Sequence, residues 1–188
     1  MIFNRKETLD VVDENDQVIG QTLRDDAHIK GLLHREVHVW VFNSKGEVLL
    51  QKRSPTKEIY PGLWDASIGG HVPSGMSYEE AALKELEEEI GIRAEPRDLI
   101  ILGKTRVKVI DSLGGTNNTH DTQYAYQYDG PVENLQVEKG EATQLRFWSF
   151  TDLWALDGRS DAIIVPVIFN EPAKSIVKKV EALSVGRA

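Results

Sequence analysis

Residues 70–92 read Gly-His-Val-Pro-Ser-Gly-Met-Ser-Tyr-Glu-Glu-Ala-Ala-Leu-Lys-Glu-Leu-Glu-Glu-Glu-Ile-Gly-Ile, and this stretch predicts a loop followed by a helix. Ser77 stands three residues before Glu80, the spacing of a capping box, in which each residue satisfies a backbone N–H at the start of a helix. Gly91 is typical of a helix end because glycine adopts the left-handed conformation readily. The sequence therefore predicts a helix from Ser77 to Ile90.

Two neighbouring arcs of this helix differ in chemistry. The apolar arc consists of Ala82, Leu83, Leu86 and Ile90, and the arc beside it carries Glu85, Glu88 and Glu89. Like charges three and four residues apart destabilise a helix by about 0.2–0.5 kcal/mol per pair, so a favourable partner is expected. Mg²⁺ is such a partner because it binds carboxylate, water and phosphate oxygens. The alternative is an acidic face that contacts only solvent.

Short segments with strand-like patterns surround the helix. Residues 8–24 predict an N-terminal β-hairpin with a turn at residues 13–16. Valines alternate within residues 34–42, and Gly46 separates that strand from another beginning at Val48. We expect a loop over residues 55–75 and strands over 99–109, 122–128 and 145–150. Residues 113–119 are expected to form a mobile loop or the tip of a hairpin. A short helix from Thr151 and a terminal helix over about 172–184 follow. This pattern favours an α/β (α+β) fold with a mixed sheet between helices.

Composition limits the classes of protein to which the chain can belong. Its 188 residues suffice for one core, so we expect a single domain over residues 1–188. No apolar run approaches the roughly 20 residues that span a bilayer, and residues 1–7 lack a secretory signal, so a cytoplasmic location is expected. The absence of cysteine excludes thiolate metal sites and thiol nucleophiles. The net charge of −8 argues against extended binding to nucleic acid but favours a cation that bridges protein and anionic substrate.

The stretch from Gly70 to Ile92 resembles the Nudix box, in which Gly, five residues, Glu, seven residues and Arg-Glu-aliphatic-any-Glu-Glu-any-Gly-aliphatic follow one another. The positions that match in register are Gly70, Glu85, Leu86, Glu88, Glu89, Gly91 and Ile92. Met76 replaces the first Glu of the pattern and Lys84 replaces its Arg. The resemblance implies a Nudix α/β/α sandwich that hydrolyses a diphosphate linkage with Mg²⁺ or Mn²⁺, held by the three matching glutamates.

Residues outside the box are similar to the subfamily that includes the type 1 isopentenyl diphosphate isomerases, over approximately residues 8–155. The segments 33–54 and 60–65 carry this similarity. It implies that Arg24, Arg53 and Lys57 bind a substrate diphosphate and that His28, His34 and His71 form a second metal site. The alternatives are ordinary surface cations and hydrogen-bonded histidines. The catalytic Cys of that subfamily stands two residues before its ligand His, where this chain has Gly69, so isomerisation by that mechanism is not expected.

The sequence leaves several points open. Glu141 resembles an acidic position that assists metal or base chemistry in some Nudix proteins, and the alternative is a surface acid at a strand end. One rival function is an isomerase with a different catalytic acid. Another is a non-catalytic nucleotide-binding module, suggested by the departures at Met76 and Lys84. The expected partner is a small diphosphate substrate of undefined identity, and the oligomeric state, including a homodimer, is open.

Overall fold

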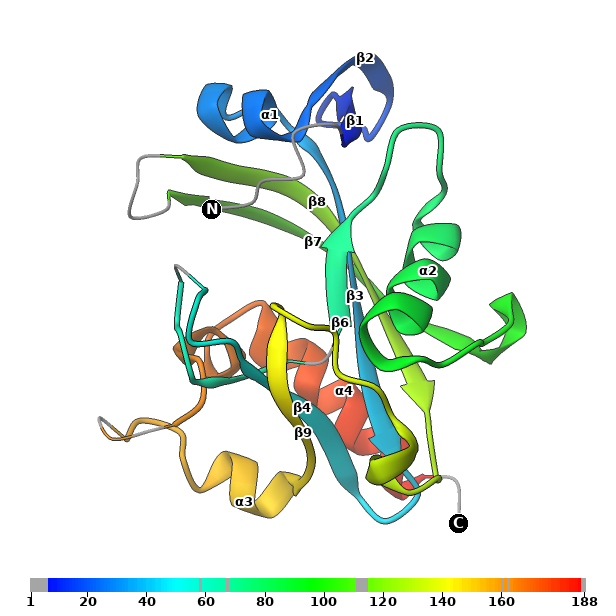
Figure 1. The fold of residues 1–188 in the computed structure, drawn as a ribbon, viewed down its shortest axis with the longest axis vertical. Coiled ribbons are helices and arrows are strands. Elements are labelled where there is room, and N and C mark those ends of the chain that lie inside the picture. The colour runs from blue at the N-terminus through cyan, green and yellow to red at the C-terminus, as the bar shows by residue number, and fades with distance from the viewer. Residues whose placement is uncertain are drawn as a thin grey trace.

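A mixed sheet of seven strands forms the centre of the computed structural model, which describes residues 7–57, 59–66, 68–110, 115–159, 161 and 163–186 (Figure 1). Its strands are β3 (His34–Asn43), β4 (Glu47–Arg53), β5 (Trp64–Asp65), β6 (Ile68–His71), β7 (Leu99–Ile110), β8 (Thr116–Gln127) and β9 (Ala142–Ser149). The order across the sheet is β5-β4-β3-β8-β7, with β6 paired to β3 and β9 paired to β4. β3 runs parallel to β8 and antiparallel to β4 and β6, which confirms the expected mixed sheet.

Helices cover both faces of this sheet. They are α1 (Arg24–Lys30), α2 (Tyr78–Ile90), α3 (Phe150–Trp154) and α4 (Ala173–Val185), with 3₁₀ turns at Pro96–Asp98, Val132–Asn134 and Pro166–Phe169. α2 lies on one side of β3, and α4 lies on the other (Figure 1). The helices predicted near residues 77–90, from Thr151 and over 172–184 are therefore confirmed, and the sheet between helices is the expected sandwich.

β3 supplies both cores because successive side chains of a strand point to opposite faces. Val37, Val39 and Val41 are buried in the cluster that contains the apolar residues of α2. Trp40 and Phe42 are buried in the cluster that contains the apolar residues of α4. The alternation seen in the sequence thus fixes which face of the sheet each helix covers.

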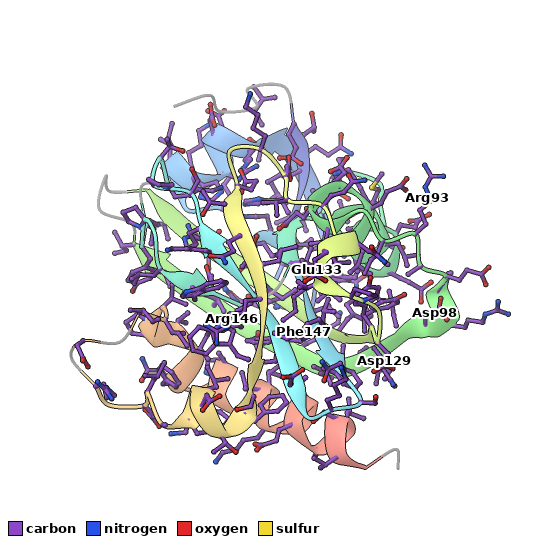
Figure 2. All side chains as sticks on the ribbon, turned by 60° about the horizontal axis from the view of Figure 1, so that its bottom comes forward. Arg93, Asp98, Asp129, Glu133, Arg146 and Phe147 are labelled. Carbon is purple, nitrogen blue, oxygen red and sulfur yellow. The ribbon has the colours of Figure 1, made fainter. Side chains whose placement is uncertain are left out.

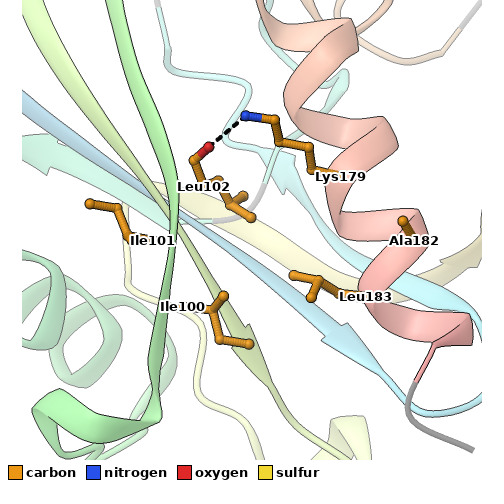
Figure 3. A pocket seen from close by; sticks show the side chains of 6 residues that line it. All are labelled: Ile100, Ile101, Leu102, Lys179, Ala182 and Leu183. Carbon is orange, nitrogen blue, oxygen red and sulfur yellow. Dashed lines mark hydrogen bonds between the residues drawn. The ribbon is translucent and has the colours of Figure 1, made fainter.

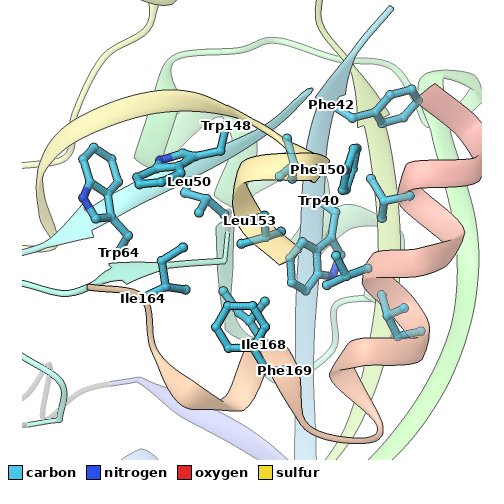
Figure 4. Packing of buried hydrophobic residues seen from close by; sticks show 14 of the residues in the cluster. Trp40, Phe42, Leu50, Trp64, Trp148, Phe150, Leu153, Ile164, Ile168 and Phe169 are labelled. Carbon is cyan, nitrogen blue, oxygen red and sulfur yellow. The ribbon is translucent and has the colours of Figure 1, made fainter. Parts of the chain in front are cut away.

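The core beneath α4 is rich in aromatic residues (Figure 4). Trp64 and Trp148 pack edge to face, with ring centroids 5.6 Å apart. The indole N–H of Trp40 donates to Gln123 Oε1 at 3.0 Å, so the polar atom of this buried ring is satisfied. On β9, Arg146 lies over the ring of Trp148, with its Cζ 4.6 Å from the centroid, while Phe147 packs against the α2 side (Figure 2).

The predicted N-terminal hairpin is confirmed as β1 (Thr8–Val12) and β2 (Val18–Leu23). Its turn ends at Asp16, which has a φ of 63°, a conformation that Asp tolerates better than most residues. The Asp16 carboxylate accepts from Arg35 Nε at 2.6 Å, Lys104 Nζ at 2.7 Å and the Tyr78 hydroxyl at 3.0 Å. One turn residue therefore fastens the hairpin to β3, β7 and α2.

We expect Asp16→Asn to lower the free energy of unfolding by about 1.5–3 kcal/mol at pH 7, because hydrogen bonds to a charged group are lost while the turn is kept. Burial alone raises the Asp16 pKa, but the bonds from Lys104, Arg35 and Tyr78 bring it below its usual value. The stabilisation is therefore present above the unfolded pKa and is lost as the pH falls through the folded pKa. Urea unfolding of both proteins at pH 7 and below pH 3.8 measures this difference. An equal difference at both pH values would contradict a role for the charge.

Two local expectations were wrong in part, and one helix was missed. β7 and β8 form an antiparallel hairpin, as one of the two expectations for residues 113–119 required, but β8 already begins at Thr116 because the polar residues there pair with β7; residues 113 and 114 lie outside the described residues. β5 and β6 lie within the loop expected over residues 55–75; β6 was hidden because its two glycines, which pair with β3, carry no strand pattern. α1 was missed, because a seven-residue helix leaves too short a pattern to recognise.

The groove between β7 and α4 lies on the α4 side of the sheet (Figure 3). It has a volume of about 320 Å³ and is lined by Ile100, Ile101, Leu102, Lys179, Ala182 and Leu183. Lys179 Nζ donates to the backbone oxygen of Leu102 at 2.7 Å at its edge. Among the described residues, no helix is both long and apolar enough to cross a membrane.

Candidate active site

The ends of α2 are fixed by the two signals in its sequence. Ser77 Oγ accepts from the Glu80 backbone N–H at 3.2 Å, and Glu80 Oε2 accepts from the Ser77 backbone N–H at 2.8 Å. Gly91 ends the helix with a φ of 75°. The buried residues of the helix are Ala81, Ala82, Leu86, Glu89 and Ile90, whereas Leu83 is only half-buried. A carboxylate is therefore held on the buried face of α2.

Glu89 is that carboxylate, and it is 5% exposed. Its Oε1 accepts from the backbone N–H of Gly69 at 3.1 Å, and its Oε2 accepts from Gln51 Nε2 at 3.2 Å. Burial raises the Glu89 pKa to about 8. Two neutral donors do not offset the desolvation of a charge, so the site favours either a proton or a cation at this carboxylate.

Glu85 lies one turn earlier and faces the next residue of β6. A Cβ atom on Gly70 would lie 2.7 Å from the Glu85 carboxyl carbon and 2.8 Å from both of its oxygens. The side chain of Glu85 is 13% exposed, and burial raises its pKa. Gly70 is therefore required because the carboxylate occupies the space of a side chain.

Glu88 and Lys84 stand at the outer edge of the helix. Glu88 is 54% exposed, and its Oε2 is 2.5 Å from Lys84 Nζ, which also lies 3.4 Å from Glu85 Oε1. Lys84 therefore contacts two of the three glutamates from the Arg position of the box. The three carboxylates do not form one of the groups of described residues whose ligand atoms all lie within 4.8 Å of one another. Glu89 is buried and Glu85 is largely buried, so these two form an inner pair, and Glu88 lies at the rim.

The cations suggested for phosphate binding differ in their surroundings. Lys57 contacts Glu141, whose negative charge acts on the Glu89 carboxyl. Arg24 is 3.1 Å from Glu7, and the charge of Glu7 acts on Glu85. Lys57 and Arg24 thus lie within electrostatic reach of the carboxylate pair.

Arg53 has a structural contact network. Its guanidinium is 2.7 Å from Asp65 Oδ2, and its Nε donates to the backbone oxygen of Ile59 at 2.9 Å. These two partners already orient the guanidinium within the protein. Phosphate binding by Arg53 stays a prediction.

Three histidines meet on the other face of β6. His28 Nε2 and His71 Nε2 are 2.9 Å apart, and the three rings of His28, His34 and His71 have centroids 5.1–5.2 Å from one another. His34 Nδ1 contacts the backbone oxygen of Leu32 at 2.8 Å, while its Nε2 is buried without a hydrogen-bond partner. Burial lowers the pKa of both His34 and His71. These imidazoles are thus neutral near pH 7, the form that binds metals.

Gly69 separates the two groups of side chains. Its N–H binds Glu89, and a Cβ atom at this position would lie 2.5 Å from His38 Nδ1. A cysteine side chain would therefore collide with His38 unless that ring moved. The structure thus gives a second reason, besides the missing residue, why the cysteine chemistry of the isomerases does not transfer to this chain.

A family model described as the NUDIX domain matches residues 32–166. The chain belongs to the Nudix family. Hydrolases of this family are also found among its relatives: a Nudix hydrolase of Listeria monocytogenes is 33% identical over 164 residues, which are 87% of this chain and 90% of that protein. The predicted family, fold and enzyme class are confirmed.

Two further relatives bear on fold and subfamily. The crystal structure of the protein DR0079 from Deinococcus radiodurans superposes with a TM-score of 0.67 at 24% identity, over 92% of this chain and 98% of that chain. The isopentenyl-diphosphate delta-isomerase 2 of Photorhabdus laumondii is 46% identical over 85 residues, which are 45% of this chain and 48% of that protein. For several other relatives the match spans about half of their length. The similarity to the isomerases thus extends beyond the box but covers less than half of the chain.

This Nudix domain contains a second cluster of metal-type side chains that was not predicted from the sequence. Glu36, His38 and Asp121 bring ligand atoms within 4.8 Å of one another beside the three histidines. The available signal was the alternation His34, Glu36, His38, which places three metal-type side chains on one face of a strand. Asp121 carried no such signal, because its position depends on the register between β3 and β8.

Proposed function

We propose that this Nudix hydrolase cleaves a diphosphate linkage in a small molecule, of the nucleoside diphosphate type or another organic diphosphate, with Mg²⁺ or Mn²⁺. The observation that carries the proposal is the pair of carboxylates formed by the buried Glu89 and the largely buried Glu85, facing the backbone of Gly69 and Gly70. Carboxylates removed from water are stabilised by a proton or by a cation, and a bound cation compensates both at once. The family assignment makes a diphosphate the anionic substrate that shares this cation.

The donor set fits such an ion. Among the described residues, Glu89 accepts from two neutral donors, and burial raises the pKa of both Glu89 and Glu85, so each charge is undercompensated without a cation. Mg²⁺ commonly takes one or two protein carboxylates and fills its remaining positions with water and phosphate oxygens. When bound, the cation stabilises negative charge on the phosphates and lowers the pKa of a coordinated water. Glu85 and Glu89 are the expected protein ligands.

The remaining residues bind and orient the substrate. Glu88, half exposed at the rim and contacted by Lys84, is placed to hold a water or a further ion. Lys57, which pairs with Glu141, and Arg24, which pairs with Glu7, are expected to bind phosphate oxygens. Glu141 keeps Lys57 in place through their ion pair, so its expected role is positioning.

Turnover of a panel of nucleoside diphosphates, nucleotide sugars, dinucleotides and isoprenoid diphosphates, measured with Mg²⁺ and with Mn²⁺, tests the proposal. At least one member should be hydrolysed, with release of orthophosphate or a phosphomonoester. Excess EDTA should abolish that turnover, and added Mg²⁺ should restore it. Isomerisation of isopentenyl diphosphate without hydrolysis, or full turnover in EDTA, would refute the proposal.

Lys57→Ala should raise KM about tenfold with a smaller change in kcat, because it removes one charge-assisted contact to the substrate phosphate. Steady-state kinetics on the best panel substrate measures both constants. Lys45→Ala is the matched control, since Lys45 is an exposed cation in the turn between β3 and β4. Identical kinetics for the wild type and Lys57→Ala would mean that Lys57 is an ordinary surface cation that does not bind the substrate.

A further inference from the structure

A second group of metal-type ligands adjoins the three histidines. His38 Nε2 lies 3.6 Å from Asp121 Oδ2 and 4.0 Å from Glu36 Oε2. The register of the sheet explains the grouping, because Asp121 of β8 and His71 of β6 are the partners of Glu36 on either side of β3. All of these side chains therefore project from the same face of three adjacent strands.

Glu36 connects the two groups. Its Oε1 lies 3.2 Å from His71 Nε2, and its Oε2 points toward His38. Asn117 Nδ2 contacts both carboxylate oxygens at 3.1 Å and holds the plane of the group. One oxygen is thus directed to the histidine trio and the other to His38 and Asp121, which is the arrangement of a bridging carboxylate.

Two deeply buried atoms in these groups have no hydrogen-bond partner among the described residues. His34 is fully buried with an unpartnered Nε2, and Asp121 has a side chain 4% exposed with an unpartnered Oδ1. A buried polar atom without a partner costs about 1–3 kcal/mol, so natural proteins rarely keep one without a reason. A coordinated cation at each group provides that reason, since both atoms have a free lone pair.

We propose that these side chains form a dinuclear transition-metal centre, with one ion at His28, His34 and His71, a second ion at His38 and Asp121, and Glu36 bridging them. The isomerase resemblance implies only the first ion. The second position follows from the grouping of Glu36, His38 and Asp121, to which the resemblance assigns no metal role. Because four imidazoles and two carboxylates meet here, the ions are of the Zn²⁺ or Mn²⁺ class and not Mg²⁺.

The centre is separate from the carboxylates of α2. The backbone of β6 lies between them: the Gly69 N–H donates to Glu89, whereas a Cβ atom on Gly69 would lie 2.5 Å from His38 Nδ1. Its ligands come from α1, β3, β6 and β8, so bound metal should tie these elements together and stabilise the folded state. This stabilisation does not depend on the proposed hydrolytic activity.

Metal stoichiometry tests the proposal. The whole protein, stripped with a chelator and returned to excess Mg²⁺ to fill carboxylate-only sites, is titrated with Zn²⁺, and bound zinc is counted by mass spectrometry after gel filtration. We expect two Zn²⁺ per chain and a higher melting temperature. His38→Gln and Asp121→Asn should each bind one Zn²⁺, while His120→Gln, a change in a β8 histidine outside both groups, should still bind two.

Each alternative outcome overturns the proposal. One Zn²⁺ per chain in the wild type would leave the histidine trio as a mononuclear site. Two Zn²⁺ in both His38→Gln and Asp121→Asn would place the second ion elsewhere. Circular dichroism of the metal-free variants checks their folding, and Asp121→Asn serves if His38→Gln does not fold. In the Mn²⁺-loaded wild type, exchange coupling in the electron paramagnetic resonance spectrum should be present and should weaken in Glu36→Gln, because the bridge is altered.

Discussion

Glu89→Gln should lower kcat by about 10²–10³-fold and leave the protein folded. The expected metal contribution is several kcal/mol, and each 1.36 kcal/mol corresponds to a tenfold change in rate. Glutamine keeps the size of the side chain and an oxygen that accepts from the Gly69 N–H, but it removes the negative charge that binds the cation. Glu85→Gln should have a similar effect, since Glu85 is the other buried carboxylate of the pair.

In the absence of metal, Glu89→Gln should raise the stability of the fold, although it lowers kcat. Burial raises the Glu89 pKa to about 8, above its unfolded value near 4.5. Glu89 therefore contributes stability below the unfolded pKa that is lost as the pH rises through about 8. Glu89→Gln removes this loss. In EDTA, the melting temperature of the variant should therefore exceed that of the wild type by more at pH 8.5 than at pH 5. Thermal unfolding at the two pH values measures it.

Glu87→Gln is the control on the same helix. Glu87 is 51% exposed, and its Oε1 lies 2.6 Å from Nε of Arg93. Its replacement should leave turnover and melting temperature nearly unchanged, because exposed ion pairs contribute about 0–1 kcal/mol. Near-normal turnover of Glu89→Gln and Glu85→Gln, or equal damage from Glu87→Gln, would mean that the metal face of α2 has been misassigned.

The parts of the fold that could be predicted carry local signals. The capping box at Ser77, the αL glycine at position 91 and the turn ending at Asp16 each act within a few residues, so their sequence patterns suffice. The alternation of residues in β3 likewise predicted which side chains lie on each face of the sheet. The spacing of Glu85 and Glu89 identified the carboxylate pair in the same way.

The parts that could not be predicted depend on contacts between distant segments. Asn118, Thr119 and Asp121 look like loop residues in the sequence, yet they are buried in β8 because β3 and β7 pair with that strand on its two edges. The sequence also placed Glu85, Glu88 and Glu89 together on one arc, whereas in the structure Glu89 is buried and Glu88 is 54% exposed. Such differences follow from tertiary packing, which helix periodicity does not contain.

Gly70→Ala should reduce kcat by about 100-fold although it adds a single methyl group. The new Cβ would lie 2.7 Å from the Glu85 carboxyl carbon, so this carboxylate must move away from the expected metal position. A displacement of about 1 Å at a reacting centre costs about that factor. Unfolding should be little affected, because the end of a flexible side chain moves and alanine also restricts the unfolded chain.

Metal affinity distinguishes this displacement from a general defect. Mn²⁺ binding, followed by water proton relaxation with the histidine groups already filled by Zn²⁺, should be weaker in Gly70→Ala than in the wild type. Gly20→Ala is the matched control, because a Cβ on this β2 glycine meets nothing within 4 Å. It should bind Mn²⁺ and turn over substrate as the wild type does. If Gly70→Ala retains both properties, Glu85 does not have to occupy the space above β6, and the carboxylate pair is not the metal site.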